Sequence, residues 1–402
     1  MANNNSRANR ASWNVARVAF VVAMFGWGLG FYGVSMYIPA LHQLRGWPIA
    51  TVSFAVTAHY LVSALIIAQL PVLYRRFGVK RVTMVGVFLS AAGALAWSRA
   101  DTLWQLAPAV LLSGAGWSAM GGAALNAIVA PWFDKDRPRA MGFAFNGASA
   151  GGLAFTPLWA FLIERFDLFV AATVLASAAV LIAFPLVARF LALAPKSATA
   201  KSYVAQPTSS RLMILRQPAF LTISVAFALG LFAQIGLVAH LIPRLGPVLG
   251  ASTAALAISL ITVCAIAGRV LLGRLLGQHD RRTAAMMNLM VQACGTGLLI
   301  VSPHPVALWT GCVLFGLGFG NLTSLPPLLA QAEFPAGDVG TVVALVTAIN
   351  QAVFAFAPGL FGLMRDVSGD YTISFATAAI AQLLAAAVIF VGRRKQARPA
   401  IS

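Results

Sequence analysis

Twelve apolar runs, most of them long enough to cross a bilayer as a helix, follow one another along the chain. A membrane-spanning helix needs about 20 apolar residues, because the hydrocarbon core is about 30 Å thick. Hydrophobic residues make up 60% of the chain and charged residues only 9%, whereas soluble domains carry about 25% charged residues. We therefore predict an all-α membrane protein with twelve transmembrane helices. Their expected ranges are 15–40, 50–74, 80–98, 103–130, 139–163, 168–192, 218–243, 253–276, 283–302, 305–332, 338–363 and 371–392.

The lysines and arginines indicate on which side of the membrane each connection lies. In membrane proteins these residues are enriched in the short cytoplasmic segments. With the N-terminus inside, 22 of the 28 Lys and Arg residues lie in or beside cytoplasmic segments, and five lie in outer loops. This asymmetry predicts that both termini are cytoplasmic (N-in and C-in). It also accounts for the formal charge of +18 without a nucleic-acid partner.

A polar stretch divides the twelve runs into two sets of six. The two sets also repeat at a spacing near 202 residues, since Gly-Ala-Gly-Trp at 114–117 matches Gly-Leu-Gly-Phe at 316–319. Parallel repeats of this kind, with a site between them, build many secondary transporters. We therefore expect two pseudo-symmetric halves. The predicted divisions are a cytoplasmic N-tail at 1–14, an N-terminal six-helix bundle at 15–192, a cytoplasmic linker at 193–217, a C-terminal six-helix bundle at 218–392 and a cytoplasmic C-tail at 393–402.

One guanidinium group is set into an apolar run, at Arg269 in the expected helix 253–276. Arginine stays charged at any accessible pH, and a central position in a membrane helix costs about 2.5–3.5 kcal/mol. A buried guanidinium attracts a carboxylate through charge-assisted bonds, and the lack of a second embedded cation favours a monoanion over a dicarboxylate. The alternative is structural: Arg269 lies about 10 Å from the expected helix end and extends its charge to the membrane surface.

His59 is the other embedded titratable group of interest, about midway along the range 50–74. All ten acidic residues lie in expected loops or at helix ends, so we do not expect a carboxylate proton relay. Histidine titrates in the physiological range, and His59 could therefore carry a symported proton. The alternative is a neutral imidazole bonded to a helix carbonyl or to a neighbouring hydroxyl group.

Three stretches carry a recognisable pattern. The first run contains Gly-Trp-Gly-Leu-Gly-Phe-Tyr-Gly at 26–33 and ends in a Gly-Trp turn at 46–47. The fifth run is preceded by Trp-Phe and basic residues and contains Ala-x-Gly-x-Ala-x-x-Gly at 140–147. In the eighth run, Arg269 is followed four residues later by Gly273. Together with the twelve helices, these stretches resemble the major facilitator superfamily, and within it the monocarboxylate and oxalate/formate transporter branch.

The resemblance implies a secondary transporter that binds its substrate between two rocking halves. Arg269 stands where this family carries its substrate-binding arginine, and runs 1, 4 and 11 correspond to cavity-lining helices. Two aromatic residues at matching places in the repeat would add apolar walls. For the uncharged residues, ordinary packing and interhelical hydrogen bonding is the alternative. Besides Arg269, the expected substrate-binding residues are Tyr32, His59, Trp117, Asn126, Phe319 and Asn350.

These observations predict a multi-pass protein of the plasma (inner) membrane that moves a small monocarboxylate, coupled to a proton or to a counter-anion. We expect a lipid-embedded monomer without a cofactor or metal ion, and we do not expect an enzyme, because the runs lack an embedded set of acids, bases or metal ligands. One rival interpretation is an exporter of amphipathic compounds in which Arg269 is structural. Another is a membrane sensor that transports nothing.

Overall fold

The computed structural model describes residues 2–133, 136–191, 209–275, 280–335 and 337–393, and the regular elements of these ranges are all helical. The N-terminal half consists of α1 (Ala2–Trp27), η1 (Gly28–Tyr32), α2 (Gly33–Arg45), α3 (Ile49–Ser98), η2 (Leu103–Gln105), α4 (Leu106–Ser118), α5 (Gly122–Val129), η3 (Ala130–Trp132), α6 (Arg137–Arg165), α7 (Leu168–Ala178), η4 (Ala179–Ala183) and α8 (Phe184–Phe190). The C-terminal half consists of α9 (Arg211–Leu215), α10 (Pro218–Leu249), α11 (Ala251–Leu275), α12 (Arg281–Val301), α13 (Pro305–Phe319), α14 (Asn321–Glu333), α15 (Val339–Phe354), α16 (Ala357–Ser368) and α17 (Thr372–Val391).

The all-helical prediction is confirmed for the described ranges, where nine helices or helix pairs are long and apolar enough to cross a membrane. The longest, α3, has 50 residues and would measure about 75 Å if it were continuous. It is interrupted at Gly78, whose φ of 78° and ψ of 152° lie outside the helical region. The two arms of α3 contain the expected ranges 50–74 and 80–98. The expected connection between these ranges is therefore a single turn at Gly78.

Several predicted helix ends were wrong. The first helix begins at Ala2 instead of residue 15, because hydrophobicity marks where a helix enters lipid and not where its backbone hydrogen bonds start. The seventh continues to Leu249 despite two internal prolines. The range 338–363 divides into α15 and α16 and ends at Ser368. Asp366, which lies beyond the expected range, is therefore in the last helical turns of α16.

The outward surfaces of the helices carry many large apolar side chains. Soluble monomers rarely expose so much contiguous apolar surface, whereas the hydrocarbon core of a bilayer would cover these side chains. The exposed set includes Leu65, Val85, Phe88, Leu111, Leu181, Ile380, Leu383 and Leu384. The chain is accordingly a multi-pass membrane protein.

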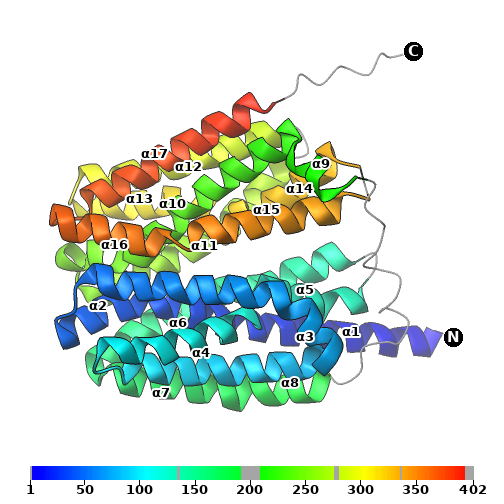
Figure 1. Ribbon diagram of the computed structural model, residues 1–402, viewed down its shortest axis with the longest axis horizontal. Coiled ribbons are helices and arrows are strands. Elements are labelled where there is room, and N and C mark those ends of the chain that lie inside the picture. The colour runs from blue at the N-terminus through cyan, green and yellow to red at the C-terminus, as the bar shows by residue number, and fades with distance from the viewer. Residues whose placement is uncertain (1, 134–135, 192–208, 276–279, 336, 394–402) are drawn as a thin grey trace.

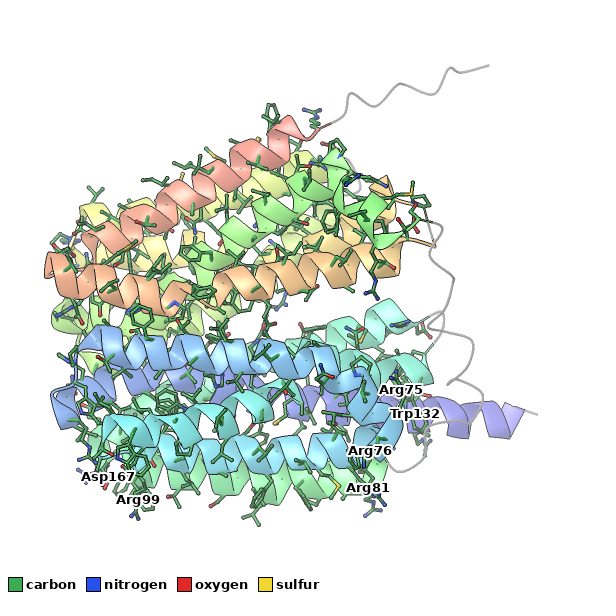
Figure 2. The ribbon with its side chains drawn as sticks, viewed as in Figure 1. Arg75, Arg76, Arg81, Arg99, Trp132 and Asp167 are labelled. Atoms are coloured by element: carbon green, nitrogen blue, oxygen red, sulfur yellow. The ribbon has the colours of Figure 1, made fainter. Side chains whose placement is uncertain are left out.

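Two helical bundles lie against each other, with α1–α8 forming one and α10–α17 the other (Figure 1). They meet through α3 with α16, α6 with α11 and α2 with α10. The start of α1 and the end of α17 lie at one end of the molecule, which we call the terminal end (Figure 1). Arg75, Arg76, Arg81 and Trp132 lie at this end, whereas Arg99 and Asp167 lie at the opposite, distal end (Figure 2).

The spacing of the sequence repeat recurs in the helix boundaries. Helices α3 and α11 begin at Ile49 and Ala251, and helices α6 and α15 begin at Arg137 and Val339. Both pairs of starting residues are 202 apart. Positions in the two halves can therefore be paired by this offset. Part of the predicted linker (residues 193–208), Met1 and the tail from residue 394 lie outside the described residues.

Candidate functional site

Arg269 lies on α11 where this helix approaches the other half. The preceding residue, Gly268, allows α11 to touch α13, since a Cβ atom there would lie 1.9 Å from the carbonyl oxygen of Leu317. This close approach brings the Arg269 side chain against Gly320, between α13 and α14, where an added Cβ would lie 3.0 Å from Nε. The guanidinium Nη2 then donates a 2.6 Å hydrogen bond to Oγ of Ser149 on α6. Arg269 thus connects the C-terminal half to the N-terminal half.

The charge of Arg269 has a neutral partner in Ser149. The salt bridges found in the described ranges involve Arg45, Arg282, Arg365 and Arg393 instead. A guanidinium carries five N–H donors, so the single bond to Ser149 leaves donors for a ligand. A partly buried cation without a carboxylate partner is costly in a membrane, and this arrangement is suited to a bound anion.

Tyr32 brings a second polar group from the N-terminal half toward Arg269. Its position in the π-helical turn η1 and its neighbour Gly152 on α6 allow this, because a Cβ at residue 152 would lie 2.7 Å from the Tyr32 hydroxyl oxygen. The same Cβ would lie 2.4 Å from Cγ2 of Thr262 on α11. Tyr32 is therefore next to the contact between the halves.

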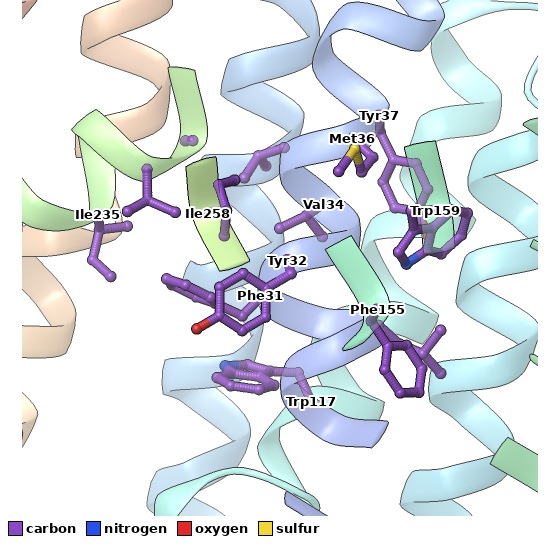
Figure 3. Packing of buried hydrophobic residues seen from close by; sticks show 14 of the residues in the cluster. Phe31, Tyr32, Val34, Met36, Tyr37, Trp117, Phe155, Trp159, Ile235 and Ile258 are labelled. Atoms are coloured by element: carbon purple, nitrogen blue, oxygen red, sulfur yellow. The ribbon is translucent and has the colours of Figure 1, made fainter. Parts of the chain in front are cut away.

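Two predicted aromatic residues lie near this contact on opposite sides. Trp117 packs edge-on against Trp27 at 4.7 Å between ring centroids and lies 6.5 Å from the nearly parallel ring of Phe31. Figure 3 shows Trp117 beside the rings of Phe31 and Tyr32. Phe319 ends α13 directly before Gly320, the residue that touches Arg269. The ring of Phe319 packs against Phe315 of the same helix at 5.9 Å between centroids, so its link to the site is its chain neighbour Gly320.

His59 lies fully buried in a closed hydrogen-bond network. Its Nδ1 is 2.8 Å from Oγ of Ser113, and its Nε2 is 3.0 Å from the carbonyl oxygen of Gly30. The indole N–H of Trp97 donates to the same Ser113 oxygen at 3.0 Å. The contacts are those of the alternative interpretation, a neutral imidazole that donates from Nε2 to a carbonyl and accepts at Nδ1 from a hydroxyl group.

The two predicted asparagines are not joined to Arg269 by any hydrogen bond in the described ranges. Asn126 donates to the carbonyl oxygen of Gly122, one turn earlier in α5, at 3.3 Å. Asn350 is buried in α15, and its Oδ1 has no hydrogen-bond partner there. A buried side-chain carbonyl without a hydrogen bond is destabilising. The Oδ1 of Asn350 is therefore able to accept a hydrogen bond from a ligand or a water molecule.

The contact between Arg269 and Ser149 breaks the internal repeat. At the offset of 202 residues, Ile67 corresponds to Arg269 and Gln351 corresponds to Ser149. The repeat therefore gives this charged contact no equivalent on the other side of the pseudo-symmetry axis.

Sequence reasoning missed Ser149, because a serine among small residues on α6 gives no signal of its own. Its partner is 120 residues away, and only the packing of α6 on α11 brings the two together. Within the described ranges, no group of three His, Cys, Asp or Glu side chains could hold a metal ion together. The site therefore consists of a guanidinium, two hydroxyl groups and aromatic rings.

The chain resembles known proteins over most of its length. The family model described as Major Facilitator Superfamily matches residues 18–358. Monocarboxylate transporter 13 of Bos taurus is 30% identical over 312 residues, which cover 75% of this chain and 71% of the relative. Monocarboxylate transporter 11 of Homo sapiens is 26% identical over 403 residues, which cover 94% of this chain and 82% of the relative. The crystal structure of a D-xylose-proton symporter aligns with a TM-score of 0.76 at 15% identity, covering 94% of this chain and 97% of the symporter, and indicates the fold alone.

Proposed function

The chain belongs to the Major Facilitator Superfamily, and from this premise we propose that it moves a small monocarboxylate across the membrane by alternating access, with Arg269 as the anion-binding residue. The family consists of membrane transporters, so the protein is a transporter and not an enzyme. The observation that carries the proposal is the guanidinium of Arg269, which crosses between the halves and bonds only to a neutral hydroxyl group in the described ranges.

The depth of this contact supports a role in transport. Ser149 lies twelve residues from the start of α6, which has 29 residues, and is therefore about 18 Å along that helix. This places the bond near the middle of the bundle, where transporters with parallel repeats hold their substrates. The position argues against the alternative in which Arg269 extends to the membrane surface.

The chemistry of the site favours a small, singly charged substrate. The guanidinium can bind one carboxylate with two parallel hydrogen bonds, and the hydroxyl groups of Ser149 and Tyr32 can bind a polar group beside it. Trp117 and Phe319 supply apolar surface for a short hydrocarbon part. Of the asparagines, Asn350 has the free acceptor, and we propose it before Asn126 as a further contact.

Two coupling modes remain within the proposal. Proton symport through His59 requires its imidazole to be protonated at Nδ1, which would displace the donor hydrogen of Ser113. Exchange against a second anion requires only that Arg269 is never left without a carboxylate while the halves move. The similarity to monocarboxylate transporters agrees with either mode.

We further propose twelve transmembrane segments with the terminal end in the cytoplasm of a cell bounded by this plasma (inner) membrane. The six-helix bundles at 15–192 and 218–392 would be the two moving units, joined by the linker at 193–217. The 22 Lys and Arg residues in or beside the proposed cytoplasmic segments support this orientation. A single chain contains both halves, and we propose that the monomer is the functional unit.

Uptake by purified protein in proteoliposomes tests the substrate class. We expect saturable uptake of labelled lactate, pyruvate or formate, inhibited by the other monocarboxylates, with little uptake of oxalate and none of the neutral amide of lactate. Stimulation by an inward proton gradient would assign symport, and stimulation by internal monocarboxylate alone would assign exchange. Equal transport of the amide, or no transport of any monocarboxylate, would contradict the anion site and favour the exporter.

A further inference from the structure

Two carboxylates at the distal end reach from one half to the other. Glu164, one residue before the end of α6, accepts a hydrogen bond from the hydroxyl group of Ser252 in the first turn of α11. Asp366, near the end of α16, accepts a 2.8 Å hydrogen bond from the backbone N–H of Ala50 in the first turn of α3. In both cases an acidic side chain at the end of one helix meets the start of a helix in the opposite half.

These two contacts are related by the internal repeat. Glu164 and Asp366 are 202 residues apart, and Ala50 and Ser252 are also 202 residues apart. The offset is the same as that between the helix starts. The repeat therefore places an acidic residue at two equivalent positions and a hydrogen-bond donor at two others, whereas it gives Arg269 no charged equivalent.

A second pair of contacts follows nearer to the centre. Oγ1 of Thr57 on α3 accepts a 3.0 Å hydrogen bond from the backbone N–H of Gly359 on α16. Oγ of Ser259 on α11 donates a 3.1 Å hydrogen bond to the carbonyl oxygen of Leu153 on α6. Thr57 and Ser259 are again 202 residues apart. The helix pairs α3 with α16 and α6 with α11 are thus both joined by a hydroxyl group at an equivalent position, although Thr57 accepts its hydrogen bond and Ser259 donates its own.

The electrostatics of the two carboxylate contacts are favourable only when the halves are closed at this end. The start of a helix carries partial positive charge and unpaired N–H groups, which stabilise a nearby anion. Glu164 and Asp366 belong to different halves from the helix starts that they contact, so separation of the distal ends breaks both interactions together. Arg365 contacts Asp366 at 3.2 Å from its own half and would stay with it on opening.

We propose that Glu164 and Asp366 form a matched pair of carboxylate latches that hold the distal end of the transporter closed. Their negative charges stabilise the conformation that is closed at the distal end, and their loss shifts the population toward one that is open there. This device acts on the equilibrium between the two conformations and does not depend on which substrate is carried.

Distance measurements between spin labels test the latches without any substrate. The labels replace Leu103 in the N-terminal half and Val301 in the C-terminal half, both exposed near the distal end. Cys264, Cys294 and Cys312 are first replaced by alanine so that only these two sites react. Pulsed electron–electron resonance in nanodiscs then gives the populations of short and long distances. A failure of monocarboxylate transport leaves this result unaffected, so the two proposals can fail separately.

The decisive variant combines Glu164→Gln with Asp366→Asn, which keeps the shapes and removes both charges. We expect the ratio of long to short distances to rise about three- to thirty-fold, the factor for two charge–helix interactions of ordinary strength. Each single variant should give a comparable part of this shift, because the two contacts are equivalent. The single variants also provide a test should the double variant fail to fold.

Asp167→Asn is the matched control. Asp167 lies at the same end, but its carboxylate accepts from the backbone N–H of Val170 at 2.7 Å, within its own half. We expect this variant to leave the distances unchanged. An unchanged distribution in the double variant would overturn the proposal, as would an equal shift in Asp167→Asn. A shift produced wholly by one of the two single variants would overturn the claim that the latches are matched.

Discussion

Substitution of Gly152 by alanine should open the distal contact between the halves. In the present conformation the added Cβ would lie 2.4 Å from Cγ2 of Thr262 and 2.5 Å from Cζ of Tyr32. Both distances are far below normal carbon–carbon contact, and Thr262 belongs to the opposite half. Extra atoms in a tightly packed interior typically cost about 1–3 kcal/mol, which corresponds to a change of roughly 5- to 160-fold in the conformational equilibrium.

The conformational change can be measured as accessibility of the distal side of the interface. We expect Gly152→Ala to raise the labelling rate of a cysteine at Ser259, which is buried between the halves, by a membrane-impermeant thiol reagent added from the distal side. The displaced Tyr32 should also weaken substrate binding. Gly142→Ala is the control on the same helix, because its added Cβ would have no atom within 4 Å. Equal labelling rates for the two alanine variants would refute the argument from close packing.

Three further substitutions test the site and the fold. Ser149→Ala should raise the KM about tenfold with little change in kcat. A hydrogen bond to a charged group is worth about 1.5–3 kcal/mol, and the lower value applies because Arg269 is only partly buried. An unchanged KM in uptake assays would remove Ser149 from the site. If coupling is by proton symport through His59, His59→Gln should retain exchange of internal for external substrate but lose accumulation driven by a proton gradient; equal loss of both in proteoliposomes would show that the imidazole only maintains packing. Glu333→Gln should lower the Tm through a loss of about 3 kcal/mol, because the carboxylate accepts two 2.7 Å hydrogen bonds from the buried Arg282; an unchanged Tm would contradict this assignment.

The helical architecture could be predicted from sequence because lipid imposes a simple rule on every segment. Backbone groups must bond within the segment, so an apolar run of sufficient length becomes a helix whatever its neighbours are. Helix boundaries were predicted less well: α3 turns sharply at Gly78, and α16 extends beyond the apolar run to include Asp366. Backbone hydrogen bonding continues past the membrane surface, where hydropathy carries no information about helix ends.

The site could be predicted only in part. Arg269 stood out because charge is rare in apolar helices, and the packing gives it a central position between the halves. Ser149 could not be found, since its significance comes from a contact between α6 and α11 that no local pattern encodes. For His59 the sequence left two interpretations open. Its contacts with Ser113 and Gly30 depend on which faces of α3, α4 and η1 meet, and hydrophobicity along one helix does not specify that.

The central claim is that the guanidinium of Arg269 binds the substrate carboxylate. The direct measurement is the initial rate of monocarboxylate uptake by the wild type and by the variants Arg269→Gln and Arg269→Lys. The control is Arg99→Gln, because in the wild type the Arg99 guanidinium lies at the distal end, 3.6 Å from the centre of the Phe169 ring. Loss of a two-bond charged contact should lower kcat/KM at least about 100-fold in Arg269→Gln, with partial activity in Arg269→Lys and normal activity in Arg99→Gln. Wild-type uptake by a correctly folded Arg269→Gln variant would contradict the claim and make the arginine a structural residue.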